Sequence, residues 1–466
     1  MKNIKARFII EDYQHYLNDV QDIVRAFSPY LILDNSACDF LRLKHFYADG
    51  VFTAQIDGTF IPQNQRQIDI DAVGDIEYKK ITKHFLKTFI YDCLSAFFGI
   101  KLPYGSLTGV RPTKLYYELL DTQTDPKSIL INDYRVSPQK AELIEECVFS
   151  QRGIYKQDTA NCDIFVNVPV CPTRCNYCSF ISAEYGKVKK LIPEYIEKVK
   201  TEIEMIKKYI SEKGLNLRSV YVGGGTPTSI GAESLSSLLS PLARCGVEFT
   251  VEAGRPDTVN DEILSVMKDN NVTRISINPQ TFNERTLKTI GRAHSVKDIY
   301  DSYEKALKYG FDINMDLIAG LEGESLLDFV YSMEKVVELS PQNVTAHTLS
   351  IKRGAAIRER QKDMGGNARE MIDFAHEYLK KHKYKPYYMY RQKNMADNLE
   401  NTGFCLEGKA CVYNIDMMED ISSVFGAGAN AMTKIYKGQK IERKAHPKHI
   451  HDYSKRDIDS LTFNFF

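Results

Sequence analysis

The stretch NVPVCPTRCNYCSF, residues 167–180, carries the clearest chemical signal in this chain of 466 residues. Its cysteines, Cys171, Cys175 and Cys178, follow the spacing C-x3-C-x2-C, which lets three thiolates converge on one soft metal centre. A structural zinc site and a cubic iron–sulfur cluster both normally take four protein ligands. Three cysteines would leave one iron of a cluster open to a substrate or cofactor. Zinc with a remote fourth ligand and three buried thiols without metal are the alternatives.

Strand-like and helical segments alternate from residue 161 onward. Apolar residues recur with helical spacing at 192–210 and 297–310. The sequence predicts strands at 163–169, 218–224, 247–253, 272–278, 312–320 and 343–350. This alternation predicts an α/β fold with a parallel sheet and right-handed crossovers. Six units make an incomplete (β/α)6 barrel, whose strand carboxyl ends form the active-site rim.

Three regions separate by pattern. Residues 1–160 mix strands and helices, with a hairpin expected at 50–60 and helices at 78–98 and from Ser137 onward, and we expect an N-terminal α+β domain. In the last helix Ser137 is the expected N-cap and Pro138 the first helical residue. Residues 161–350 form the predicted barrel core, and 351–466 a C-terminal accessory domain that caps the substrate site.

Bulk composition narrows the class of protein. Lys plus Arg and Asp plus Glu are both 61, so the formal net charge of zero argues against nucleic acid as a partner. No segment approaches the roughly 18 consecutive apolar residues of a membrane span, and the start of the chain lacks the apolar region of a signal peptide. Ten cysteines, scattered except for one cluster, favour reduced thiols and one metal site. We therefore expect a cytoplasmic protein.

Candidate binding residues follow the predicted strands. The segment YVGGGTPTSI ends the second strand, and its glycines, with Gly224, Gly225 and Thr226 at the centre, allow a backbone to approach a ligand closely. A plain tight turn is the alternative for this segment. Further polar residues occur at or after the next strands: Glu252, Gln280, Arg292 and Asp316. Carboxylates suit ribose hydroxyls, and glutamine can both donate and accept.

The three-cysteine motif after the first strand of an incomplete barrel resembles the radical S-adenosylmethionine (SAM) enzymes. The resemblance implies that Cys171, Cys175 and Cys178 hold a [4Fe–4S] cluster whose open iron is chelated by SAM. One-electron reduction then splits SAM into methionine and a 5′-deoxyadenosyl radical. The protein positions that radical and excludes competing reactions.

Within that superfamily, CPTRCNYC, GGGTPT, RISINPQTF and DLIAGL occur in the order of the oxygen-independent coproporphyrinogen III oxidases. This resemblance covers roughly residues 161–433. It implies that SAM is contacted by the residues at the positions of the family's SAM contacts, namely Phe165, Gly224, Gly225, Thr226, Glu252, Gln280, Arg292 and Asp316. In this branch two SAM molecules lie near the cluster.

The segments GSLTGVRPTKL, VEAGRPDT and YYMYRQKNMADNLENTGF are similar to the coproporphyrinogen dehydrogenase variant of this branch. The implied reaction is oxidative decarboxylation of two propionates of coproporphyrinogen III to vinyls, giving protoporphyrinogen IX for heme biosynthesis. The implied partners are the porphyrinogen and a low-potential electron donor such as flavodoxin or ferredoxin. We expect a monomer.

Two residues depart from the best-known members of the branch. Phe180 stands where they have a further cysteine, and Phe165 stands where they have a tyrosine. Both substitutions also occur around the heme chaperones of the same superfamily. A heme-binding chaperone that keeps the cluster fold, or a radical SAM heme-modifying enzyme, therefore stays as the alternative.

Other residues are candidates for the substrate. Arg391 and Lys393, with Arg174 as a further candidate, suit the four carboxylates of a porphyrinogen, and a solvated charged face is the alternative. His446, His449 and His451 are candidate heme ligands, for which a surface loop is the better interpretation. Cys405 and Cys411 are a weak signal for a second metal site.

Overall fold

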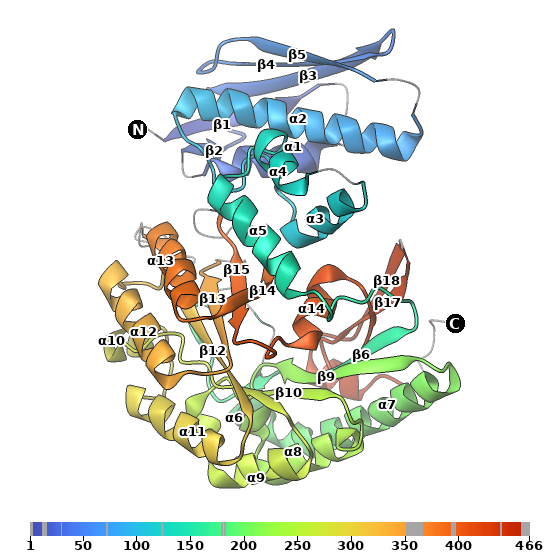
Figure 1. Cartoon of the computed structure of the whole chain (residues 1–466), viewed down its shortest axis with the longest axis vertical. Helices are drawn as coiled ribbons and strands as arrows, with labels where there is room; N and C mark the ends of the chain where they lie inside the picture. The colour runs from blue at the N-terminus through green and yellow to red at the C-terminus, as the bar shows by residue number, and fades with distance from the viewer. Residues whose placement is uncertain are drawn as a thin grey trace. The chain divides into compact units, whose positions relative to one another are not determined.

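The computed structural model of the chain describes residues 3–11, 16–28, 30–70, 73–122, 125–178, 180, 183–350, 367–392, 398–438 and 440–457. The chain divides into two compact units, Met1–Glu145 with Asp397–Leu399, and Glu146–Ala396 with Glu400–Phe466. Each unit contains its own large sheet (Figure 1).

The first unit is an α+β structure around a five-stranded sheet with the order β2-β1-β3-β4-β5. Buried apolar side chains of α1, α2 and this sheet form its core. The strands are β1 (Ile4–Ile10), β2 (Leu31–Leu33), β3 (Phe40–Ala48), β4 (Val51–Gly58) and β5 (Asn64–Asp69). The helices are α1 (Leu17–Ala26), α2 (Asp75–Phe98), α3 (Pro112–Leu120) and α4 (Pro126–Asn132).

The predicted hairpin at residues 50–60 is wrong in its position. Residues 51–58 form the single strand β4. It pairs with β3 across a tight turn at Asp49 and Gly50, and with β5 across residues 59–63. Both turn residues have positive φ, 50° and 81°, which is the requirement of the tight hairpin turn that Asp-Gly favours. The helix expected at 78–98 is confirmed as α2, three residues longer at its start.

Helix α5 (Pro138–Ser150) begins as the sequence predicts. The Ser137 hydroxyl oxygen accepts from the Lys140 N–H at 3.4 Å, and Pro138 is the first helical residue. The division between the two units falls inside this helix, after Glu145.

The second unit is built on an eleven-stranded sheet with the order β14-β15-β13-β12-β11-β10-β9-β6-β16-β17-β18. Its centre confirms the predicted incomplete barrel, because six neighbouring strands run parallel. These strands are β6 (Asn161–Val168), β9 (Asn216–Gly224), β10 (Glu248–Glu252), β11 (Arg274–Ser276), β12 (Asp312–Ala319) and β13 (Asn343–Thr348).

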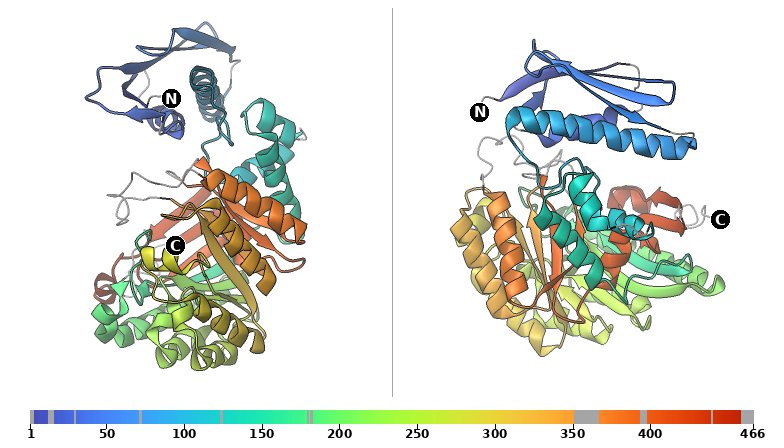
Figure 2. Two further views of the ribbon diagram at one scale, coloured as in Figure 1. Left: turned by 90° about the vertical axis from the view of Figure 1, so that its left-hand side faces the viewer. Right: turned by 45° about the horizontal axis from the view of Figure 1, so that its top comes forward.

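Helices follow the outer side of these strands (Figure 1), and Figure 2 shows the same layering from two further sides. The helices are α7 (Ile192–Glu212), α8 (Ala232–Leu239), α9 (Asp261–Asp269), α10 (Glu284–Thr289), α11 (Val296–Lys308) and α12 (Leu326–Leu339). In α11, for example, Ile299, Ser302, Tyr303 and Ala306 are buried, which is the i, i+3, i+4, i+7 spacing of one helix face. Shorter elements are β7 (Val170–Cys171), β8 (Ala183–Glu184), α6 (Tyr185–Val188) and the 3₁₀ turns η2 (Lys189–Leu191), η3 (Pro227–Ile230), η4 (Ser240–Leu242) and η5 (Pro256–Thr258).

The strands that follow residue 350 in the chain belong to the same sheet as the six parallel strands. Antiparallel β15 pairs with β13 at one edge, and β16 pairs parallel with β6 at the other. Both edges of the open barrel are thereby covered by further strands. The elements after residue 350 are α13 (Ala368–Lys381), β14 (Lys385–Tyr390), β15 (Asn401–Cys405), α14 (Val412–Glu419), β16 (Ser423–Ala427), β17 (Met432–Lys437), β18 (Lys440–Ala445) and α15 (Ile450–Ser454). Among the residues that the structure describes, no helix is both long and apolar enough to cross a membrane.

Candidate active site

A cavity of about 530 Å³ lies in the second unit, along the inner side of the parallel strands. Its position follows from strand geometry, because alternate side chains of a strand share one face: Asn314 and Asp316 of β12 both line the cavity. Every residue that the sequence marks for the cluster or for SAM lines this one cavity: Phe165, Cys171, Cys175, Cys178, Gly224, Gly225, Thr226, Glu252, Gln280, Arg292 and Asp316.

The three cysteines come from β7 and the loop after it. Cys171 ends β7, while Cys175 and Cys178 lie in the loop, which is fixed by Asn176: its backbone N–H donates to Ile290 O at 3.0 Å and its Nδ2 to Thr289 O at 2.8 Å. In the part of the chain that the structure describes, no three His, Cys, Asp or Glu side chains form a group for a single metal ion. Burial raises the pKa of the Cys178 thiol, and the neighbouring Cys175 and Cys171 raise it further.

The glycine segment after β9 holds Cys171 in place. A Cβ on Gly225 would lie 2.5 Å from the carbonyl oxygen of Val170, so only glycine lets the two backbones approach this closely. The Thr226 N–H donates to that same oxygen at 2.6 Å, and the Thr226 hydroxyl donates to Cys171 Sγ at 3.6 Å. The sequence predicts a close approach of this segment to a ligand, and that stays a prediction. The close approach in the structure is to the strand that carries the first cysteine.

Two carboxylates line the cavity, and their pKa values are shifted in opposite directions. Burial raises the pKa of Glu252 to about 7, although its oxygens accept from the Tyr221 hydroxyl at 2.8 Å and the Gly224 N–H at 3.3 Å. Burial also acts to raise the pKa of Asp316, but His347, 3.5 Å away, and the donor Asn314, at 2.7 Å, outweigh it and the pKa is lowered. Asp316 therefore carries the more stable negative charge.

Unsatisfied polar atoms mark a place for a ligand. Gln280 Oε1 and Asn278 Oδ1 are buried without a hydrogen-bond partner, and both residues line the cavity. Gln280 also has a φ of 68°, a left-handed conformation that costs free energy in a residue with a Cβ. Buried acceptors of this kind normally find partners. Together with two carboxylates and three thiols, they fit a polar cofactor such as SAM beside a thiolate-ligated cluster.

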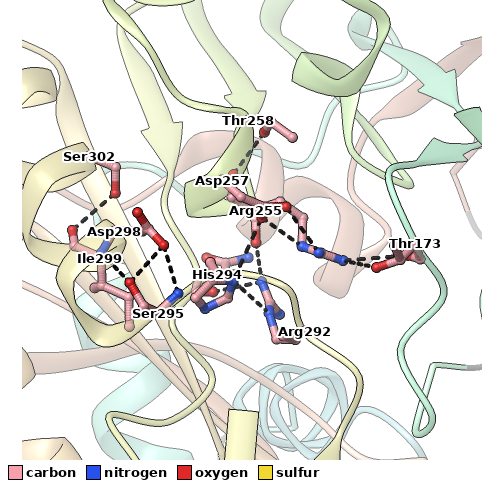
Figure 3. A network of polar contacts seen from close by, with 12 residues as sticks. Thr173, Arg255, Asp257, Thr258, Arg292, His294, Ser295, Asp298, Ile299 and Ser302 are labelled. Carbon is pink, nitrogen blue, oxygen red and sulfur yellow. Dashed lines mark hydrogen bonds and ion pairs between the residues drawn. The ribbon is translucent and has the colours of Figure 1, made fainter. Parts of the chain in front are cut away.

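Arg292 and Arg255 belong to a polar network behind the cysteine loop (Figure 3). Arg292 donates to the carbonyl oxygens of Gly254 at 2.5 Å and Asn278 at 2.9 Å, and to the Tyr177 hydroxyl at 3.1 Å. Arg292, a predicted SAM contact, thus lines the cavity, and its guanidinium group donates hydrogen bonds to protein atoms. Arg255 was not singled out by the sequence, although an arginine directly after a strand that ends in Glu252 was a usable signal.

An aromatic wall closes the cavity on another side. Phe165 in β6 packs against Tyr413 of α14, with ring centroids 6.1 Å apart, and Tyr413 stacks on Tyr221 at 4.4 Å. Tyr388 and Tyr390 of β14 stack at 6.4 Å and line the same cavity. Tyr388, Tyr390 and Tyr413 come from the region that the sequence assigned to a substrate cap.

The remaining candidates divide between the cavity and other places. Arg174 lines the cavity, and Phe180 lies at its edge with 64% of its surface exposed. Arg391 is not among the lining residues, and Lys393 lies outside the described residues.

The histidines and the cysteine pair do not form sites of their own. His446 is buried against Glu202, with its Nε2 2.7 Å from Oε1, whereas His449 and His451 are exposed. Cys405 and Cys411 are buried free thiols, and they belong to no metal-binding group among the described residues.

Glu252→Gln should stabilise the protein without ligand at pH values near 8 and have little effect near 5. The pKa of Glu252 is about 7 in the folded protein against about 4.5 in the unfolded chain. The wild-type protein therefore loses stability as the pH rises from about 4.5 to about 7, because folding then requires a buried charge or the uptake of a proton. Glutamine cannot ionise and escapes this loss. Melting temperatures at both pH values test this, with Glu377→Gln, an exposed change on α13, as control. Equal shifts in the melting temperature of Glu252→Gln at both pH values would contradict a raised pKa of Glu252 in the folded protein.

Comparison with known proteins agrees with this geometry. Residues 168–336 match the model of the radical SAM superfamily. The chain is 34% identical to the oxygen-independent coproporphyrinogen-III oxidase-like protein HemZ of Bacillus subtilis, over 87% of this chain and 84% of that protein. It is 33% identical to the heme chaperone HemW of Lactococcus lactis, over 57% and 68% of the two chains. The fold matches coproporphyrinogen III oxidase (HemN) from Escherichia coli, a radical SAM enzyme, with a TM-score of 0.52 at 18% identity, covering 66% of this chain and 71% of that one.

Proposed function

Because the chain belongs to the radical SAM family of oxygen-independent coproporphyrinogen-III oxidase-like proteins, with a [4Fe–4S] cluster and SAM as its cofactors, we propose that it decarboxylates coproporphyrinogen III. Two propionate side chains would become vinyl groups, giving protoporphyrinogen IX. One observation carries this proposal: a single cavity joins three thiols, unsatisfied polar acceptors and a wall of aromatic rings. Such a cavity can hold a polar cofactor next to a large ring system.

The roles of the residues follow from their places on the wall. Cys171, Cys175 and Cys178 would ligate the cluster, and Gln280 and Asp316 would orient SAM through its polar groups. When bound, the cofactors would supply one-electron chemistry for the removal of a hydrogen atom from a propionate β-carbon.

The aromatic wall performs a different task in the proposal. Tyr388, Tyr390 and Tyr413 would pack against the macrocycle and exclude water from the reacting carbon. Loss of carbon dioxide, with transfer of one further electron to an external one-electron acceptor, would then give the vinyl group.

Arg174→Gln should raise the KM for coproporphyrinogen about tenfold or more, because a charge-assisted hydrogen bond to a carboxylate contributes about 1.5–3 kcal/mol. Arg174 is one of the candidate carboxylate partners, and its position among the lining residues of the cavity supports this role. The KM for SAM and the iron content should not change. The control is Arg244→Gln, which changes an exposed arginine that does not line the cavity and should leave the KM for coproporphyrinogen unchanged. Unchanged KM for the porphyrinogen would remove Arg174 from the proposal.

A second candidate function is heme carriage. It is favoured by the similarity to HemW over 57% of the chain and by Phe180 at the cavity edge, where the sequence departs from the best-known oxidases. A carrier would bind heme stoichiometrically and transfer it, without product formation. The aromatic wall would suit heme as well as a porphyrinogen.

An anaerobic assay separates the two functions. The reconstituted protein is mixed with SAM, a low-potential reductant and coproporphyrinogen III, and products are identified by mass. Protoporphyrinogen or the three-propionate intermediate, together with 5′-deoxyadenosine, would support decarboxylation. SAM cleavage without decarboxylation, combined with stoichiometric heme binding, would favour the carrier.

The proposed reaction also needs partners. A flavodoxin or ferredoxin of low potential would reduce the cluster, and a cytoplasmic location would keep the thiols reduced. We propose that the protein acts as a monomer.

A further inference from the structure

Arg255 is a cationic side chain that the structure places beside Cys175, one of the three proposed cluster ligands. Its Nη1 lies 3.8 Å from Cys175 Sγ, 3.1 Å from Thr173 Oγ1 and 3.4 Å from the Thr173 carbonyl oxygen. The side chain is buried, with 3% of the residue exposed, and it lines the cavity. A buried N–H donor and positive charge therefore face the sulfur of the second cysteine in the motif.

Asp257 holds the other side of this guanidinium. Its two carboxylate oxygens accept from Arg255 Nε at 3.0 Å and Nη2 at 3.2 Å, a bidentate pair that fixes the plane of the group. His294 Nδ1 lies 3.7 Å from the same carboxylate. This pair leaves Nη1 on the side of Thr173 and Cys175, and Asp257 offsets part of the charge. Figure 3 shows Arg255 between Asp257 and Thr173.

Arg292 does not share this task. Its guanidinium donates to backbone carbonyls and to the Tyr177 hydroxyl, and its Nε lies 3.5 Å from His294 Nδ1. All four of these partners are oxygen or nitrogen atoms, whereas Arg255 Nη1 lies 3.8 Å from Cys175 Sγ. The two arginines are therefore separable by mutation.

We propose that Arg255 is a positioning residue that raises the reduction potential of the cluster, and that Asp257 limits the size of that effect. Hydrogen bonds to the sulfurs and net charge near the cluster are among the features that set the potential of an iron–sulfur centre. Reduction adds a negative charge, so a cation and a donor at Cys175 stabilise the reduced state. This inference rests on the family's cluster, and it holds for either proposed function.

The test is a redox titration of the reconstituted full-length protein without substrate, followed by the electron paramagnetic resonance signal of the reduced cluster. Arg255→Gln should lower the midpoint potential, since it removes the cation and leaves Asp257. Asp257→Asn should raise the potential, because the charge of Arg255 is then no longer offset. The double variant should lie between them, and Arg255→Lys should restore part of the potential. Arg285→Gln, an exposed change on α10, should leave the potential unchanged.

Opposite signs distinguish this effect from simple loosening of the loop, which would move both single variants in the same direction. Shifts of equal sign, or no shift in Asp257→Asn, would overturn the inference. If Arg255→Gln fails to retain the cluster, the midpoint potential of Asp257→Asn decides whether the inference holds, because that variant keeps the arginine. Failure of the wild-type protein to bind a cluster would overturn the cofactor assignment together with this inference. The predicted shifts in midpoint potential without any decarboxylation of coproporphyrinogen would contradict only the proposed decarboxylase function.

Discussion

Cys175→Ala is expected to abolish both the visible absorbance of the cluster and the cleavage of SAM. Two remaining thiolates cannot hold a cluster that the family binds through three, and Arg255 would lose its sulfur partner at 3.8 Å. Cys171→Ala and Cys178→Ala should have the same effect, since all three residues line one cavity. Iron content, absorbance and 5′-deoxyadenosine production measure the loss.

The matched control for these variants is Cys245→Ala. Cys245 is a partly buried free thiol between η4 and β10, and it does not line the cavity. Iron content and SAM cleavage should therefore stay at the wild-type level. Intact SAM cleavage in all three cluster-cysteine variants would contradict the assignment of the metal site.

Gly225→Ala is expected to destabilise the protein and deplete the cluster. The new Cβ would lie 2.5 Å from Val170 O and 2.8 Å from Val170 C and N, so backbone atoms rather than a flexible side chain must move. Overpacking of this kind costs about 1–3 kcal/mol in the free energy of unfolding. Because Val170 directly precedes Cys171, the displacement should also reduce the iron bound per chain. Denaturant unfolding and iron analysis measure the two effects.

Gly186→Ala supplies the comparison for this variant. A Cβ on Gly186, in α6, would meet no heavy atom within 4 Å. Alanine there should leave stability unchanged or raise it slightly, since it restricts the unfolded chain. A wild-type stability and iron content in Gly225→Ala would show that the segment after β9 can move away from Val170.

The central part of the fold was predictable because the local patterns are strong. The six parallel strands read as short apolar runs between helices, and the structure confirms each of them. The cysteine spacing also predicted which loop would carry the metal ligands, and the structure brings its three cysteines to one cavity. The hairpin at residues 50–60 was misplaced because Asp-Gly occurs twice, at 49–50 and 57–58, and only the first pair forms the turn.

Contacts between residues far apart in the chain could not be predicted from the sequence. Arg255 and Cys175 are 80 residues apart, and no local pattern indicates that a guanidinium lies beside that sulfur. Tyr413 reaches Tyr221 because α14 packs over β9, and β14 reaches the cavity because β15 pairs with β13. Such contacts arise only once the sheet is assembled.

The most direct test of the decarboxylase proposal is a label-transfer experiment. Coproporphyrinogen III deuterated at the propionate β-carbons is incubated anaerobically with the reconstituted protein, SAM and a low-potential reductant, and both 5′-deoxyadenosine and the porphyrinogen are analysed by mass. The account predicts deuterium in 5′-deoxyadenosine together with a porphyrinogen that has lost carbon dioxide. Unlabelled 5′-deoxyadenosine with all four propionates intact would contradict it.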